Sequence, residues 1–255
     1  MPRIAPPGGA VDWPASEGTL GVVGVAPWAT LDFCRVLYRA VRASKDWHFP
    51  RLLLDINTKI PSRGRHLQLG ETDPSGAIAA TIAELAGMGA TIAVVVCNTA
   101  HILYDRWAPG AAIPVLDIIE ETVRRAAAGG AIRVAPLVST SLAEADLYGK
   151  RARALGLSSL RLKPDDQAVV DDLIAAIKLS GNVPAASAAA VDGLFGRLQE
   201  NGVDTLLAGC TELSVLEESS ARRGLGFVDS NLALARAALS RLHLPKDLIR
   251  PELPA

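Results

Sequence analysis

Two cysteines, Cys97 and Cys210, occupy matching positions in this 255-residue chain. Each ends a short apolar run and begins a polar stretch, Cys-Asn-Thr-Ala-His in the first case and Cys-Thr-Glu-Leu in the second. Two thiols on opposite sides of a substrate can invert an acidic carbon, because one thiolate removes a proton from one face while the other thiol returns a proton to the opposite face. Such a reaction requires neither pyridoxal phosphate nor a metal ion, provided that the site stabilises the carbanion-like state.

A free cysteine is most often a small buried hydrophobic residue. We assign that role to Cys34, which lies inside a helical pattern. Cys97 and Cys210 differ, because each is expected at a strand end that leads into a helix. Free backbone N–H groups at a helix N-terminus lower the pKa of a thiol and bind carboxylates, which favours a functional role for both residues.

The polar residues next to the two cysteines are candidate substrate ligands. Asn98, Thr99 and Thr211 are favourable helix N-caps, and the same amide and hydroxyl groups can hold the α-carboxylate of a substrate. His101 and Glu212 follow the two cysteine motifs. Each of them could tune a thiol or lie in solvent.

A basic segment that contains Lys59, Arg63 and Arg65 follows another expected strand end. Loop cations of this kind usually form a solvated surface. At the cleft, however, one of them could pair with a side-chain carboxylate of the substrate.

Strands alternate with helices along the chain, which predicts parallel sheets covered by helices on both faces. Apolar runs predict strands at 19–25, 52–56, 92–96, 113–116, 132–138, 160–163, 205–208 and 227–228. Periodic stretches predict helices at 30–45, 75–88, from about 101, and at 118–128, 142–155, 168–179, 188–202 and 231–241. We expect a polar loop at 58–73, a poorly ordered arm at 1–17 and a tail at 245–255.

The chain also repeats itself. The apolar run that ends in Cys97 recurs 113 residues later at Cys210, and Val-Leu-Asp ending at Asp117 recurs 112 residues later as Phe-Val-Asp ending at Asp229. The first strands match at a similar spacing. These matches predict two α/β halves related by a pseudo-two-fold axis, with one cysteine from each half at the cleft between them. The expected domains are 18–117 with 225–255, and 118–224.

The composition excludes several classes of function. The chain has 26 Lys and Arg against 27 Asp and Glu, so no basic surplus favours a nucleic-acid or anionic-membrane partner. Three cysteines without a CxxC spacing favour neither a disulfide framework nor structural zinc. No apolar run approaches the length of a membrane span, and the N-terminus lacks the apolar core of a signal peptide. We therefore expect a reduced, cytoplasmic protein that uses no metal and no cofactor.

The segments Val-Cys-Asn-Thr-Ala-His at 96–101 and Gly-Cys-Thr-Glu-Leu at 209–213 resemble the two signature motifs of the aspartate/glutamate racemase superfamily. Their forms resemble those of the aspartate racemase branch, and the resemblance extends from about residue 19 to residue 242. It implies two similar Rossmann-like α/β domains, a homodimer, and cofactor-independent racemisation of an acidic amino acid. Cys97 and Cys210 would be the two acid/base residues.

The same resemblance implies further contacts with the substrate. A stretch with an asparagine and several basic residues, a mid-chain Ser-Thr motif and a lysine near the cleft also match the family. The residues implied to contact the substrate are Asn57, Lys59, Arg63, Asn98, Thr99, Ser139, Thr140, Lys178, Thr211 and Glu212.

The first loop departs from the family pattern. It reads G-V-A-P-W-A-T at 24–30, one residue shorter than the usual G-G-M-G-P-x-A-T, and it brings the bulky Trp28 to the expected cleft. Leu142 replaces a threonine that is common in the middle motif. These changes leave the identity of the substrate amino acid open.

Two other classes of function stay open from the sequence. An enzyme on the same scaffold could catalyse cis–trans isomerisation of an unsaturated diacid or decarboxylation of a malonate, with a thiol as nucleophile or one-sided acid. A protein that binds an amino acid or senses redox state without turnover is the third hypothesis.

Overall fold

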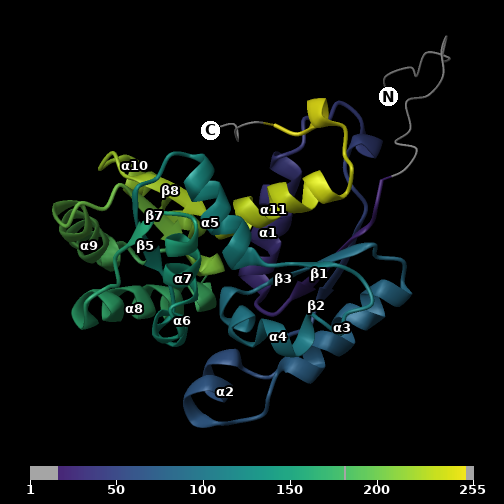
Figure 1. The fold of residues 1–255 in the computed structure, drawn as a ribbon, viewed down its shortest axis with the longest axis horizontal. Helices are drawn as coiled ribbons and strands as arrows, with labels where there is room; N and C mark the ends of the chain where they lie inside the picture. Colours follow the sequence, from purple (N-terminus) through teal and green to yellow (C-terminus); the bar gives the residue numbers. More distant parts are fainter. Residues whose placement is uncertain (1–16, 181, 251–255) are drawn as a thin grey trace.

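The protein contains two four-stranded parallel sheets, each flanked by helices (Figure 1). The computed structural model describes residues 17–180 and 182–250, so the expected arm up to residue 16 and the end of the tail lie outside the described residues. The first sheet has the strand order β2-β1-β3-β4, and the second has the matching order β6-β5-β7-β8. The prediction of two similar α/β halves is therefore confirmed.

The central strands of both sheets are buried and largely aliphatic, because helices cover both faces. Their parallel register pairs Gly24 with Val96 in the first sheet and Leu137 with Ala208 in the second. Cys97 directly follows β3, and Cys210 follows β7 after one residue, Gly209. The strands are β1 Leu20–Gly24, β2 Leu52–Ile56, β3 Ile92–Val96, β4 Val115–Leu116, β5 Arg133–Leu137, β6 Ser158–Ser159, β7 Thr205–Ala208 and β8 Gly226–Asp229.

Helices follow most of the strands. The α-helices are α1 Pro27–Arg39, α2 Arg63–Leu69, α3 Ser75–Gly87, α4 Tyr104–Trp107, α5 Ile118–Ala128, α6 Thr140–Ala145, α7 Leu147–Ala154, α8 Pro164–Ser180, α9 Ala188–Glu200, α10 Glu217–Ala221 and α11 Ser230–Arg241. The 3-10 helices are η1 Asp46–His48, η2 Asn98–Leu103, η3 Ala185–Ser187, η4 Thr211–Leu216 and η5 Lys246–Leu248.

Several boundaries differ from the sequence prediction. Helix α1 begins at Pro27 rather than at residue 30, because proline suits the first turn of a helix. The expected polar loop at 58–73 contains helix α2. The Ser62 hydroxyl accepts the N–H of Arg65 at the start of α2, and Gly70 ends the helix with a φ of 67°.

The second half contains two further differences. The predicted helix at 142–155 is two helices, α6 and α7, because Asp146 adopts a left-handed conformation with φ 51° between them. Strand β6 lies at Ser158–Ser159 rather than at 160–163, and Pro164 begins helix α8 earlier than expected.

Helices α5 and α11 join the two halves. Helix α5 follows a strand of the first sheet but contacts β7 and β8 of the second, whereas α11 follows β8 and contacts β3 and β4 of the first. The two helices pack against each other, and one apolar cluster includes Val94, Val123, Leu207 and Leu234 from both sheets and both helices. The halves therefore share a core.

The pairing of β8 with β7 places this strand in the second sheet. This pairing contradicts the predicted return of the chain to the first domain at residue 225, whereas α11 does pack against the first half. The division into two domains otherwise stays a prediction.

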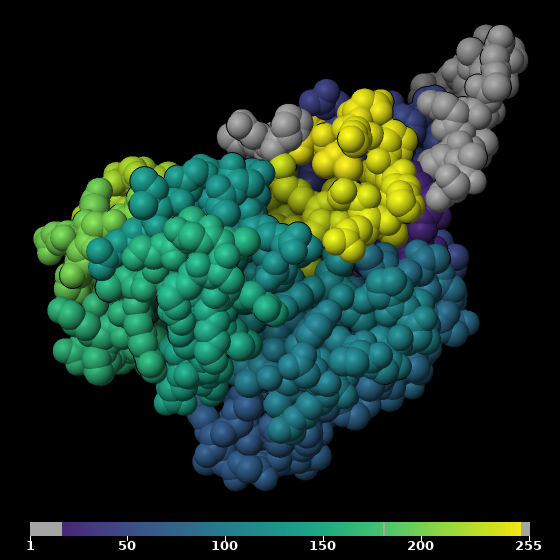
Figure 2. All heavy atoms as spheres, viewed as in Figure 1, coloured from purple at the N-terminus to yellow at the C-terminus, as the bar shows by residue number. Residues whose placement is uncertain are grey.

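The blue segment that contains α2 projects beneath both halves in Figure 2. Helix α2 contacts α6 and η2, so it lies across one edge of the space between the halves. Within the described ranges, no helix is both long enough and apolar enough to span a bilayer.

Candidate active site

A cavity of about 430 Å³ lies between the two halves, at the carboxyl ends of their central strands. Ligands bind at this position in open parallel sheets. The structure brings both cysteines and most of the other predicted site residues to this cavity. Those that line it are Arg63, Cys97, Asn98, Thr99, Ser139, Thr140, Lys178, Cys210, Thr211 and Glu212.

The two cysteines have equivalent backbone positions. Cys97 is the N-cap residue of η2 and Cys210 is the N-cap residue of η4, and both have extended backbone angles. Each thiol therefore stands where a strand ends and a turn of helix begins. The Cys97 side chain is half-buried and the Cys210 side chain is buried.

The surroundings of Cys210 differ from those of Cys97 because they include the carboxylate of Glu212. Its Oε2 atom accepts a hydrogen bond from the Cys210 thiol at 3.0 Å and another from the Thr211 hydroxyl at 3.1 Å. Burial, together with the negative charge and the hydrogen bond of Glu212, raises the pKa of the Cys210 thiol well above its ordinary value. Cys210 is therefore a protonated thiol at neutral pH.

Asn98 is a buried link between the two halves. Its Nδ2 donates to the Ser230 hydroxyl at 3.0 Å, and its Oδ1 accepts from the Tyr148 hydroxyl at 2.7 Å. Ser230 begins α11 and Tyr148 belongs to α7. Asn98 is thus held by α11, which follows β8, and by α7, which comes after β5 in the chain.

His101 has a structural role. Its Nδ1 lies 2.9 Å from the Cys97 carbonyl oxygen, which can only accept, so Nδ1 carries the proton. Its Nε2 then accepts the Ile118 N–H at 3.4 Å. Burial lowers the pKa of His101, which keeps the ring neutral. His101 is buried and does not lie in solvent, the alternative left open by the sequence.

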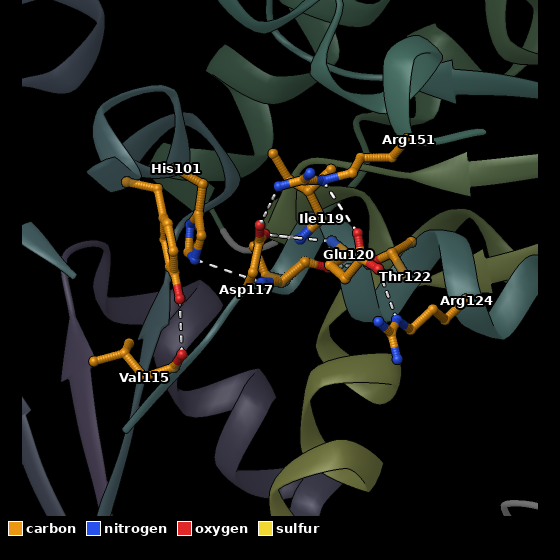
Figure 3. A network of polar contacts seen from close by, with 10 residues as sticks. His101, Val115, Asp117, Ile119, Glu120, Thr122, Arg124 and Arg151 are labelled. Atoms are coloured by element: carbon orange, nitrogen blue, oxygen red, sulfur yellow. Dashed lines mark hydrogen bonds and ion pairs between the residues drawn. The ribbon is translucent and has the colours of Figure 1, made fainter. Parts of the chain in front are cut away.

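A polar network next to His101 fixes the start of α5 (Figure 3). Asp117 accepts the Ile119 and Glu120 N–H groups at 2.9 and 3.3 Å. Arg151 of α7 pairs with Asp117 at 3.0 Å and with Glu120 at 3.1 Å. Asp229 likewise accepts the Asn231 N–H at the start of α11, so the sequence repeat is matched by equivalent helix caps.

Residues of α6 and α8, together with Ser139, form part of the cavity wall. The Thr99 and Ser139 hydroxyl oxygens are 3.2 Å apart. Asp171 of α8 accepts hydrogen bonds from both the backbone N–H and the hydroxyl of Thr140. Asp171 lines the cavity, and sequence reasoning missed it because it belongs to no motif.

Helix α2 contributes Arg63 and Gln68 to the cavity. Arg63 is buried, and its Nη1 donates to the carbonyl oxygens of Ile60 and Pro61. Its Nε has no hydrogen-bond partner among the residues that the structure describes. Gln68 donates to the Ser141 hydroxyl at 3.2 Å, which joins α2 to α6 across the cavity edge. Gln68 was not found because residues 58–73 were interpreted as a loop.

Asn57 and Lys59 do not line the cavity. The Asn57 amide donates to the Thr81 hydroxyl at 3.1 Å and its carbonyl oxygen accepts the Lys59 N–H, so Asn57 shapes the turn after β2. The Lys59 side chain is exposed. These two predicted substrate contacts are therefore not brought to the site.

Trp28 also lies away from the cavity. It belongs to helix α1 and is 51% exposed, while Val25 and Ala26 form that part of the wall. Leu142 is buried and does not line this cavity. Of the two departures from the family pattern, the shortened loop reaches the cavity through Val25 and Ala26, whereas Trp28 and Leu142 do not line it. In the described part of the chain, no three His, Cys, Asp or Glu side chains are grouped so that they could hold a metal ion.

The cavity is thus shared by two similar α/β halves, and each half contributes one thiol to its lining. The family model for Asp/Glu/hydantoin racemases matches residues 21–238. The chain therefore belongs to this family and is an isomerase of the racemase class.

Solved structures show the same fold. Picrophilus torridus aspartate racemase aligns with a TM-score of 0.80 and 24% identity, over 91% of this chain and 97% of that one. A glutamate racemase isoform from Bacillus anthracis aligns with a TM-score of 0.65 and 18% identity, over 92% of this chain and 85% of that one.

A curated relative is similar in sequence. The broad specificity amino-acid racemase RacX of Bacillus subtilis is 25% identical over 211 residues, which cover 82% of this chain and 88% of the relative.

Proposed function

We propose that the protein is a cofactor-independent racemase of acidic amino acids, in which Cys97 and Cys210 transfer protons on opposite faces of the α-carbon. The observation that carries the proposal is the shared cavity lined by both thiols, each at the N-cap position of a 3-10 helix. Backbone N–H groups of those turns, with Asn98, Thr99 and Thr211, hold the α-carboxylate. They also stabilise the carbanion-like state.

The two thiols have unequal roles in the resting enzyme. Cys210 is protonated because it is buried and lies beside Glu212, so it donates a proton to the face of the substrate α-carbon on its own side of the cavity. When the reaction runs in reverse, the negative charge of Glu212 makes the Cys210 thiolate a stronger base. Cys97, which is half-buried, takes the complementary role on the other face.

Two cationic side chains in the cavity lining support the binding of an acidic substrate side chain. Arg63 and Lys178 line the cavity, and Arg63 has no carboxylate partner within the described residues. The carboxylate of Asp171 is directed to Thr140. A buried guanidinium group without a counter-ion supports the binding of a substrate carboxylate.

An exchange screen tests this function. Purified protein in D₂O is incubated with a panel of amino acids, and NMR follows deuterium at Cα while chiral chromatography follows inversion. We expect both signals for aspartate or glutamate, and an approximately 10–100-fold rise in KM for the same substrates in Arg63→Met, since a charged hydrogen bond is lost. No Cα exchange with any amino acid, or a covalent thiol adduct of a diacid by mass spectrometry, would overturn the proposal.

We also propose that the protein is a homodimer in the cytoplasm. Trp28, Leu31 and Tyr38 follow one side of α1 and are 51%, 48% and 37% exposed. Three partly exposed apolar side chains beside Arg35 on one side of a surface helix support burial against a second copy. Sedimentation velocity on wild type and Leu31→Glu tests the association, and wild-type sedimentation as a 26.7 kDa monomer would contradict it.

A further inference from the structure

A second cavity, of about 210 Å³, lies on the other side of α6 and shares no lining residue with the active-site cavity. Helix α7 and the end of α6 form one wall, and residues after β5 and β6 form the other. Val138, Leu142, Leu160 and Leu162 form an apolar patch on a surface that is otherwise polar. The volume exceeds the roughly 150 Å³ of an engineered cavity that binds benzene, so an aromatic ring can lie against this patch while a short polar chain meets the polar part.

Two arginines, Arg153 and Arg161, make part of the cavity lining positively charged. Arg153 donates to Asp146 at 2.6 Å. Arg161 is exposed, and it makes no hydrogen bond or ion pair with any residue that the structure describes. Asp146 provides the one carboxylate that lines the cavity among the described residues, against two guanidinium groups. The net positive charge favours an anionic group on the ligand.

Tyr148 connects the second cavity to the active site. Its ring lines the second cavity, and its hydroxyl donates to Asn98, which lines the first cavity beside Cys97. The ring also packs against Gly209, because a Cβ at that glycine would lie 2.7 Å from a ring carbon. Gly209 directly precedes Cys210. Displacement of this ring would therefore move both cysteine motifs.

The joint between α6 and α7 lies just before Tyr148 in the chain. Asp146 holds a left-handed φ of 51° at this joint and is tied to Arg153. An anion bound in the cavity would compete with Asp146 for Arg153. Loss of that ion pair frees the turn that precedes Tyr148.

We propose that the second cavity is a regulatory site for a small aromatic carboxylate, whose carboxylate binds Arg161 and Arg153 and whose ring contacts Tyr148. Occupancy displaces the Tyr148 hydroxyl from Asn98 and slows turnover at the cysteines. The effect on turnover rests on the proposed racemase function, whereas binding to the cavity does not.

Calorimetry with phenylacetate tests the site. We expect binding to wild type and to Cys97→Ala, about tenfold weaker binding to Arg161→Ala, and unchanged binding to Lys163→Ala. Lys163 is the matched control, an exposed cation two residues away that does not line the cavity. Ala143→Phe, which fills the cavity, should abolish binding. Absence of binding to wild type, or equal affinity in Arg161→Ala, would overturn the proposal even if no racemase substrate is found.

Kinetics then test the coupling between the cavities. Phenylacetate should lower kcat and leave KM unchanged in wild type, and Arg161→Ala should keep its basal rate while losing this inhibition. Tyr148→Phe retains the ring but not the hydroxyl, so it should still bind phenylacetate with its kcat no longer affected. Inhibition that raises KM alone would show that phenylacetate occupies the active site and would contradict the proposal.

Discussion

Glu212 and Thr99 occupy the same position relative to the two cysteines but surround them differently. Glu212 accepts a hydrogen bond from the Cys210 thiol, whereas the Thr99 hydroxyl lies against Ser139. The repeat therefore conserves the backbone position of each thiol while the chemistry beside it differs. This difference provides a direct test of how the site controls the Cys210 thiol.

We predict that Glu212→Gln lowers the pKa of Cys210, because burial remains but the nearby negative charge is removed. The thiolate then forms at lower pH, and alkylation of Cys210 by iodoacetamide at pH 8 should be about tenfold faster for each unit by which the pKa falls. The measurement uses a background in which Cys34 and Cys97 are serine. An unchanged alkylation profile would show that Glu212 does not control this thiol.

At the scale of elements, η2 is fixed to α5 through His101. The ring is buried and neutral, so its pKa in the folded protein lies below the unfolded value. Below about pH 6.5 the unfolded chain binds a proton that the folded protein excludes. The stabilising contribution of His101 is thus present above that pH and is lost as the pH falls.

We predict that His101→Gln weakens this acid destabilisation, since glutamine can retain a hydrogen bond to the Cys97 carbonyl without titrating. Urea unfolding at pH 7.5 and pH 5.5 measures the free energy of unfolding at each pH. The difference between the two values should be smaller in His101→Gln than in wild type. An equal difference in both proteins would place the acid sensitivity elsewhere.

Prediction from sequence succeeded where an element is bounded by local signals. Strands β3 and β7 are apolar runs that end at polar residues, and their limits match the structure. Helix α2 was missed, although Ser62 and Gly70 mark its ends, because it has little apolar periodicity. Asp171 could not be found, because its partner Thr140 is 31 residues away in the chain and only tertiary packing joins them.

At the scale of the whole molecule, the shared core makes the two halves dependent on each other. Helix α5 packs on the second sheet and α11 on the first, so neither half can unfold without exposing apolar surface of the other. Both cysteine motifs belong to this joined structure. The spacing across the active-site cavity is therefore set by the α5–α11 packing.

We predict one cooperative unfolding transition. The tryptophans that the structure describes, Trp28, Trp47 and Trp107, all lie in the first half, so their fluorescence reports on that half, while far-UV circular dichroism reports on both halves. The two signals should give the same urea midpoint. Leu239→Ala in α11 should shift both midpoints down together and lower the free energy of unfolding by about 2–5 kcal/mol. Midpoints that separate would show that the halves unfold independently.

The central claim is that the two thiols act on opposite faces of one α-carbon. The most direct measurement is deuterium exchange at Cα in D₂O for each enantiomer of the substrate, with Cys97→Ala and Cys210→Ala compared with wild type. We predict that neither variant racemises, and that each exchanges the α-proton of one enantiomer only, with the opposite preference in the two variants. Full racemisation by either variant, or the same preference in both, would contradict the account.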